Sequence, residues 1–240
     1  MEPARKRATL IVDGAYFEIG VNFFAKKTHI MLQWQLANVQ YLLNSIQSIC
    51  GVDFVSSKFI TAENENSILV KKDFHNYLLS NNVEVDVREF KKEKEFCPNC
   101  KKHYDRVIQA EVDVAIAVAI CEEVFYKTKD PVDTIVLIAG DRDFKDALKS
   151  AIDKKEVEII LIGYENTMSY ELKSLSGIRF LPILNNILAD VFKPTPKITS
   201  PKKSIDNWDI FGFTPIITTK PHNKSPRNPK KRIKIEKKKK

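Results

Sequence analysis

Two aspartates, Asp141 and Asp143, stand immediately after an apolar run at residues 133–140 that ends in Ala-Gly. A third, Asp13, ends a shorter apolar run, and a fourth, Asp113, interrupts an otherwise apolar stretch. Several carboxylates placed together repel one another unless a cation lies among them. Hard divalent ions such as Mg²⁺ and Mn²⁺ take oxygen ligands, and their open positions accept a phosphate oxygen and a water. The four aspartates therefore predict a metal site suited to the hydrolysis of phosphate esters.

Each of these aspartates also has an ordinary structural interpretation. Asp143 could cap a helix that begins at Phe144, and Asp141 could serve the turn after the strand. Asp13 could be a turn residue before Gly14. A single aspartate would favour the structural role, but the set as a whole favours the metal.

The chain must bring these residues together, and its pattern indicates how. Continuous apolar strands that alternate with helices predict a mainly parallel sheet covered by helices on both faces. In such sheets ligands bind outside the carboxyl ends of the strands, which is where three of the four aspartates stand. The predicted strands are 8–14, 52–62, 83–90, 133–140, 157–164 and 178–183. The predicted helices are 34–50, 67–81, 105–127, 144–153 and 169–175.

The charge is divided unevenly along the 240 residues. Residues 191–240 carry 15 Lys and Arg against 3 Asp and Glu, whereas residues 1–190 have a net charge of −4. Seven of the eleven prolines also fall in 191–240. Such a composition buries too little apolar surface to offset chain entropy. The sequence therefore predicts a folded domain at 1–190 and a disordered basic tail at 191–240.

Two features of the tail concern partners. The final basic run includes Lys230, Lys231 and Arg232, and it is typical of a nucleic-acid contact or a nuclear import signal. A solubilising tail is the alternative. The aromatic segment Trp208–Phe213 could dock on a protein partner or on the body, or could be a chance cluster.

Composition excludes several classes of protein. No apolar run approaches the roughly 20 residues that a membrane span needs, so no membrane partner is expected. The N-terminus lacks the apolar stretch and cleavage site of a secretory signal. We therefore expect an intracellular protein, cytoplasmic or, if the basic run acts as an import signal, nuclear.

A cysteine pair lies in a lysine-rich insertion at about residues 91–105. Cys97 and Cys100 have the spacing of zinc ligands, and His103 follows, but a structural zinc site normally has four ligands. Cys50 and Cys121 fall in predicted core helices and favour burial as small apolar residues. Three interpretations stay open: zinc held by Cys97, Cys100, His103 and a fourth ligand; zinc shared between the protomers of a homodimer; or two free thiols.

The sequence resembles a known family in the segments "TLIVDGAYFE", "AEVDVAIAVAI" and "TIVLIAGDRDF", followed by "EIILIGY" and "LKSLSGIRFLPI". In that order they are similar to the NYN domain, a branch of the PIN-like nucleases, over about residues 8–185. The resemblance implies a Rossmann-like three-layer α/β/α sandwich. It also implies Mg²⁺- or Mn²⁺-dependent cleavage of RNA. By motif, the metal-binding and catalytic acids fall on Asp13, Asp113, Asp141 and Asp143.

Three positions depart from the family pattern. Tyr16 stands where Asn is common, Arg142 where a small residue such as Ser is common, and Ala110-Glu111 where Lys-Gly is frequent. We assign Tyr16 and Arg142 to substrate contact, although Arg142 could instead pair with the acids and weaken metal binding. The favoured interpretation is a metal-dependent ribonuclease. The alternatives are a non-catalytic RNA-binding or scaffolding protein and a phosphatase of small esters, which the basic tail argues against.

Overall fold

The computed structural model describes residues 4–29, 32, 34, 37–109, 111–127, 131–155, 157–164 and 166–192, with the side chains of a few of these left out. The chain divides into two units, 1–203 and 204–240, and the described residues all belong to the first. None of the described helices is both long and apolar enough to cross a membrane.

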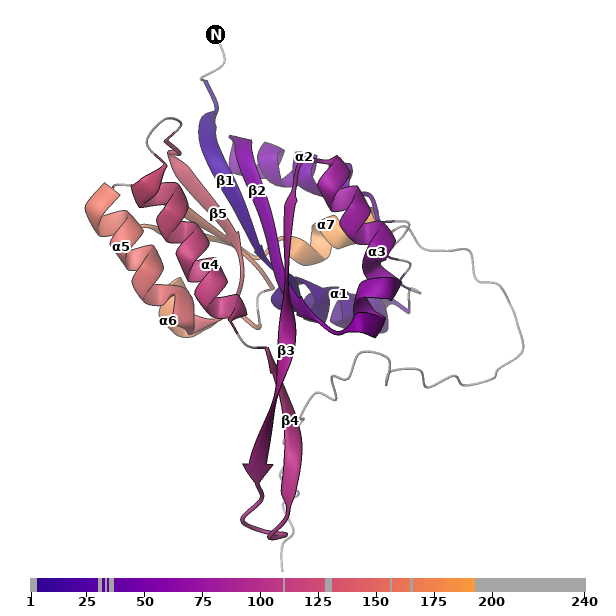
Figure 1. Cartoon of the computed structure of the whole chain (residues 1–240). Coiled ribbons are helices and arrows are strands. Elements are labelled where there is room, and N and C mark those ends of the chain that lie inside the picture. Colours follow the sequence, from indigo (N-terminus) through magenta and orange to yellow (C-terminus); the bar gives the residue numbers. More distant parts are fainter. Residues whose placement is uncertain are drawn as a thin grey trace, which may run out of the picture. The chain divides into compact units, whose positions relative to one another are not determined.

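A seven-stranded sheet forms the centre of this unit, in the order β4-β3-β2-β1-β5-β6-β7 (Figure 1). All neighbouring strands run parallel except β3 and β4, which are antiparallel. The strands are β1 (Lys6–Asp13), β2 (Val52–Glu63), β3 (Glu84–Phe96), β4 (His103–Gln109), β5 (Thr134–Ile138), β6 (Glu158–Ile162) and β7 (Ile178–Leu181). The predicted α/β class with a mainly parallel sheet is confirmed.

Helices cover both faces of the sheet, which makes the three layers visible in Figure 1. One face carries α1, α2, α3 and α7, and the other carries α4, α5 and α6. The helices are α1 (Gly14–Thr28), α2 (Val39–Cys50), α3 (Glu65–Ser80), α4 (Val112–Cys121), α5 (Lys145–Lys155), α6 (Tyr170–Lys173) and α7 (Leu184–Val191). A π-helical turn, Glu122–Tyr126, continues α4, and a 3₁₀ turn, Arg142–Phe144, precedes α5.

The central strand β1 shows why its sequence is a continuous apolar run. Side chains alternate across a strand, so Leu10 and Val12 enter the core under α1, α2 and α3, while Ile11 enters the core under α4 and α5. Both faces are covered, and neither face can accept a polar residue without a partner. The apolar run ends only at Asp13, which is the last residue at the carboxyl end of the strand.

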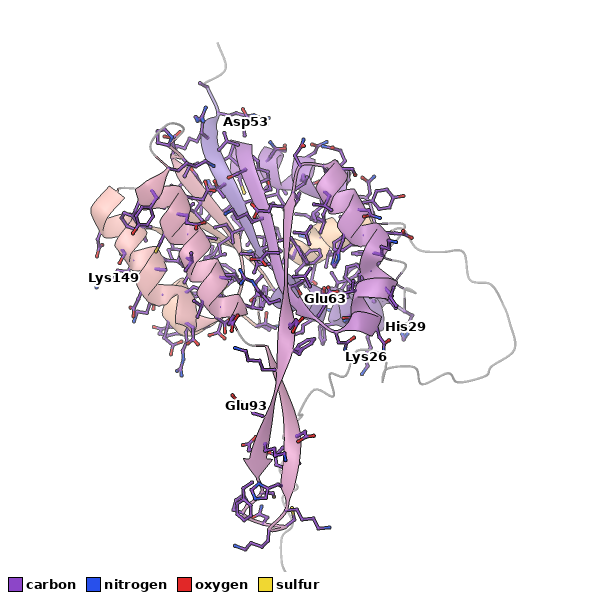
Figure 2. The ribbon with its side chains drawn as sticks, viewed as in Figure 1. Lys26, His29, Asp53, Glu63, Glu93 and Lys149 are labelled. Carbon is purple, nitrogen blue, oxygen red and sulfur yellow. The ribbon has the colours of Figure 1, made fainter. Side chains whose placement is uncertain are left out.

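The segment before α4 corrects the prediction of one helix at 105–127. Residues 103–109 form β4, and α4 begins only at Val112. β4 pairs with the end of β3 from Phe90↔Gln109 to Phe96↔His103, so the insertion predicted at 91–105 is a long hairpin. Figure 1 shows this hairpin extending away from the body, and Figure 2 labels Glu93 on it.

The C-terminal side of the domain adds a helix that the sequence pattern did not indicate. α7 packs beside α2, and its last residue, Val191, and the following Phe192 are both buried. The ring of Phe192 meets Trp34 edge to face, with centroids 5.4 Å apart. Val191 and Phe192 therefore belong to the core of the body, although the predicted tail begins at 191.

Candidate active site

The carboxyl end of β1 places the first predicted ligand. Asp13 is the last residue of the strand and the N-cap of α1, and its Oδ1 accepts a hydrogen bond of 3.0 Å from the backbone N–H of Tyr16. The side chain is buried. Asp13 is therefore a helix cap, and it also remains a candidate ligand because capping occupies only part of a carboxylate's capacity to accept hydrogen bonds.

The end of β5 places the next two. β5 lies beside β1 with Val12 opposite Ile138, so residues just beyond these strand ends face the same edge. Asp141 caps the 3₁₀ turn, and its Oδ1 accepts the N–H of Asp143 at 3.1 Å. The alternative that Asp143 caps a helix beginning at Phe144 does not hold, because the chain makes a 3₁₀ turn there and Asp141 is its cap.

Asp113 reaches this edge from the helical layer. It lies in the first turn of α4, which packs against β1 and β2. The preceding Glu111 has a left-handed backbone (φ 75°), and its carboxylate forms an ion pair with Lys91 of β3. This bend turns the chain from the hairpin into α4 and sets Asp113 at the opening of the helix.

Electrostatic repulsion acts between several pairs of these carboxylates. Burial, and after it the charges of Asp113 and Asp141, raises the pKa of Asp13 to about 6 despite hydrogen bonds from the backbone. Partial burial also raises the pKa of Asp113, followed by repulsion from Asp141 and Asp143. The site therefore concentrates negative charge that a cation would relieve.

The donor set suits an ion that keeps water ligands. Within the described residues, no three His, Cys, Asp or Glu side chains lie close enough together to hold a metal ion as they stand. Mg²⁺ is commonly bound by one or two carboxylates and several waters, so it does not require a preformed cage. Carboxylate oxygens are the ligands that such an ion takes, and which of the four aspartates would hold it stays a prediction.

Tyr16 makes hydrogen bonds and packing contacts that its position in the sequence did not suggest. Its hydroxyl accepts the N–H of Tyr164 at 2.9 Å and lies 3.0 Å from the hydroxyl of Thr167. Its ring lies against Gly140 and Gly163, where any Cβ would overlap it. Tyr16 therefore ties α1 to the ends of β5 and β6, and its contact with substrate stays a prediction.

The other predicted substrate contacts lie at the surface or beyond the described residues. Arg142 is exposed between Asp141 and Asp143, so a phosphate could reach its guanidinium. Lys230, Lys231, Arg232 and the aromatic segment Trp208–Phe213 lie outside the described residues.

A buried charged cluster next to this edge escaped the sequence analysis. Glu63 ends β2, and its Oε1 lies 3.1 Å from Lys71 Nζ and 3.2 Å from His75 Nε2, both on α3. Lys71 also pairs with Glu18 of α1. Figure 2 labels both Asp53, near the amino end of β2, and Glu63, at its carboxyl end. The only sequence indication was the position of Glu18 in the "DGAYFE" segment.

The two carboxylates of this cluster respond differently to burial. Burial raises the pKa of Glu18 to about 7, because its attraction to Lys71 only partly compensates and Glu63 repels it. Burial also opposes ionisation of Glu63, but hydrogen bonds and charge from His75 and Lys71 hold its pKa below the usual value. Glu63 is thus the ionised partner, while Glu18 is protonated over part of the range below neutrality.

This chain is similar to known proteins both in sequence and in fold. The NYN domain model matches residues 7–184, and the chain belongs to the NYN domain family, a branch of the PIN-like nuclease superfamily. Among solved structures, a protein of unknown function from Vibrio parahaemolyticus RIMD 2210633 is similar, with a TM-score of 0.51 and 14% identity over 75% of this chain and 96% of that chain. At that identity the likeness shows the fold alone. No curated protein matches the sequence.

The charge of Asp13 should reduce the stability of the metal-free protein. Asn also caps helices well, so Asp13→Asn keeps the bond from Tyr16 while removing the buried charge. A pKa raised from 3.8 to about 6 corresponds to about 3 kcal/mol at most, so we expect a gain of about 1–3 kcal/mol at pH 7. Urea denaturation in the presence of a chelator measures this difference in the free energy of unfolding. Asp13→Ala, which also loses the cap, should be less stable than Asp13→Asn. An Asn variant less stable than wild type would contradict the prediction.

Glu18 should make stability depend on pH. Its pKa is raised from 4.5 to about 7 in the folded protein, so the folded state binds the extra proton and stability falls as the pH rises through this range. Glu18→Gln removes this titration and keeps an acceptor for Lys71. Its stability relative to wild type should therefore rise by about 1–3 kcal/mol between about pH 4.5 and about pH 8.

The measurement is urea unfolding of both proteins across that pH range. The exposed Glu171→Gln on α6 is the control and should track wild type at every pH. A constant difference between Glu18→Gln and wild type would show that Glu18 does not titrate in this window.

Proposed function

We propose that the protein is a divalent-metal-dependent ribonuclease whose site consists of Asp13, Asp113, Asp141 and Asp143. One observation carries the proposal: four aspartates from two strand ends and a helix opening repel one another at the carboxyl edge of the sheet. Membership of the NYN family adds RNA as the substrate class. The proposal therefore rests on a site that a cation would stabilise and on membership of a family whose members act on RNA.

The residues of this chain have distinct roles in the proposal. The four carboxylates would hold Mg²⁺ or Mn²⁺, which supplies the Lewis acidity that activates water and neutralises charge on the phosphodiester. Asp141 also fixes the turn through the hydrogen bond that its Oδ1 accepts from the Asp143 N–H, which would hold the two carboxylates on one short segment. Arg142, exposed between them, would orient a phosphate by charge and hydrogen bonding.

A second candidate is a non-catalytic RNA-binding protein with the same fold. Tyr16 favours it, because its hydroxyl is occupied by Tyr164 and Thr167 at a position where the family commonly has a polar Asn. The basic tail would then provide affinity without turnover. Activity measurements separate the two candidates.

Asp141→Asn should abolish metal-dependent cleavage while leaving the fold intact, because Asn can still cap the turn. We expect turnover of labelled single-stranded RNA in Mn²⁺ to fall by at least about 100-fold, the scale of losing one preorganised electrostatic contact. The matched control is Asp53→Asn, near the amino end of β2 and so at the opposite end of the strands from Asp13 and Asp141. This variant should cleave like wild type. Equal activity of wild type and Asp141→Asn, or activity that persists in a chelator, would contradict the proposal.

The tail should contribute RNA affinity that depends on salt but not on sequence. Its 15 basic residues lie after Phe192, so truncation at that point keeps the buried end of α7. Each phosphate contact made by the tail contributes a log–log salt slope of about −0.7 for single strands, so truncation should flatten the slope and weaken binding. Fluorescence anisotropy over a salt series measures both.

Cleavage by the truncated protein at low salt and high concentration should persist, because the four aspartates belong to the body. An unchanged affinity and slope would show that the tail is not an RNA contact. An import or solubilising role would then be preferred.

A further inference from the structure

The tip of the β3–β4 hairpin has a defined backbone geometry. The N–H of Cys97 donates to the carbonyl of Lys102, and the N–H of Lys101 donates back to the carbonyl of Cys97, both at 2.9 Å. Lys101 adopts a left-handed conformation with φ 57°, which closes the turn. The segment from Cys97 to Lys102 is therefore a tight turn that holds both cysteines on one short loop.

The two cysteines of this turn lie in a polar setting. Only Pro98 and Asn99 separate Cys97 from Cys100, which is the Cys-x-x-Cys spacing of zinc ligands. Cys100 is exposed and Cys97 is partly exposed, so a metal can reach both. The turn therefore presents two closely spaced cysteines to a soft metal.

The described part of the chain offers no complete ligand set around these sulfurs. His103 lies opposite Phe96 in the ladder, with ring centroids 5.2 Å apart, and no third metal-binding side chain joins the two cysteines within the described residues. Cys50 ends α2 and Cys121 ends α4, both in the body. The tip therefore supplies half of a tetrahedral site.

We propose that two copies of this protein meet at their hairpin tips and share one Zn²⁺ between Cys97 and Cys100 of each copy. A structural zinc site normally has four ligands in tetrahedral arrangement, and two identical half-sites related by a two-fold axis provide them. The hairpin extends away from the sheet and its helices, so its tip is presented for such a meeting (Figure 1).

Charge and exposed apolar surface at the tip agree with this partner. Zinc with four thiolates carries two net negative charges, and Lys101 and Lys102 follow Cys100 directly, with Lys94 exposed on the strand before. These lysines offset the charge of the cluster and would repel each other across the dimer without it. Phe96, beside Cys97, is 47% exposed and could be covered by the second copy.

The test uses the full chain purified with a thiol reductant and without chelator. We expect 0.5 zinc per chain by elemental analysis, a dimer by light scattering, and four sulfur neighbours at about 2.3 Å in zinc X-ray absorption. A strong chelator should give monomers that zinc restores to dimers. Cys97→Ser/Cys100→Ser should be monomeric and free of zinc, whereas Cys121→Ser, the control, should behave like wild type.

Four results would overturn the proposal. One zinc per monomeric chain, lost in His103→Ala, would assign the metal to a site within one chain. A dimer that contains no zinc and that dissociates when more reductant is added would be linked by a disulfide. A dimer that persists in the double variant would be formed elsewhere, and monomers without zinc would have free thiols. Circular dichroism checks that the double variant folds. If it does not fold, the conversion of wild-type dimers to monomers by the chelator still tests the proposal.

Discussion

The bond from the Tyr16 N–H to Asp13 Oδ1 is the interaction on which the acidic edge depends. It joins the last residue of β1 to the first turn of α1, so strand and helix follow each other without a loop. The carboxylate is buried there, and ionisation is opposed by low polarity and by Asp113 and Asp141. The backbone N–H groups at the start of the helix compensate part of that cost, which keeps an acidic group in a place that would otherwise exclude it.

Such a junction requires α1 to lie very close to the sheet. A Cβ on Gly14 would overlap Thr61 and Phe59 of β2, and a Cβ on Gly20 would overlap the ring of Tyr164. Tyr16 then extends over the end of β5 and bonds to the backbone after β6. Tyr16 is therefore a packing residue that fixes the strand ends beside Asp13. Fold and site share the same contacts.

The parallel sheet could be predicted because strands covered on both faces, such as β1, β5 and β6, are continuous apolar runs that alternate with helical segments along the chain. Position at a strand end indicated Asp13, Asp141 and Asp143, and the cost of a carboxylate in an apolar helix indicated Asp113. The sequence pattern did not predict β4, because residues 105–109 precede an apolar helix without a break in composition, and their partner strand decides their conformation.

The cluster of Glu18, Glu63, Lys71 and His75 could not be predicted for a related reason. Its members come from two helices and a strand that are separated along the chain, and each alone is an ordinary charged residue of its element. Only the packing of α1 and α3 on β2 brings them together and buries them. Contacts between segments that are distant in the chain leave no local pattern in the sequence, whereas helix caps and strand ends do.

The hairpin connects the two places where this protein concentrates ligand-forming side chains. β4 leads from the cysteine turn to Gln109, and the chain then bends at Glu111 into α4, whose first turn holds Asp113. Lys91 of β3 pairs with Glu111 and so fastens that bend to the base of the hairpin. Antiparallel pairing makes the hairpin a continuous ladder from its tip to this bend. The same hairpin thus carries the cysteine turn at its tip and, at its base, leads into the segment that places Asp113.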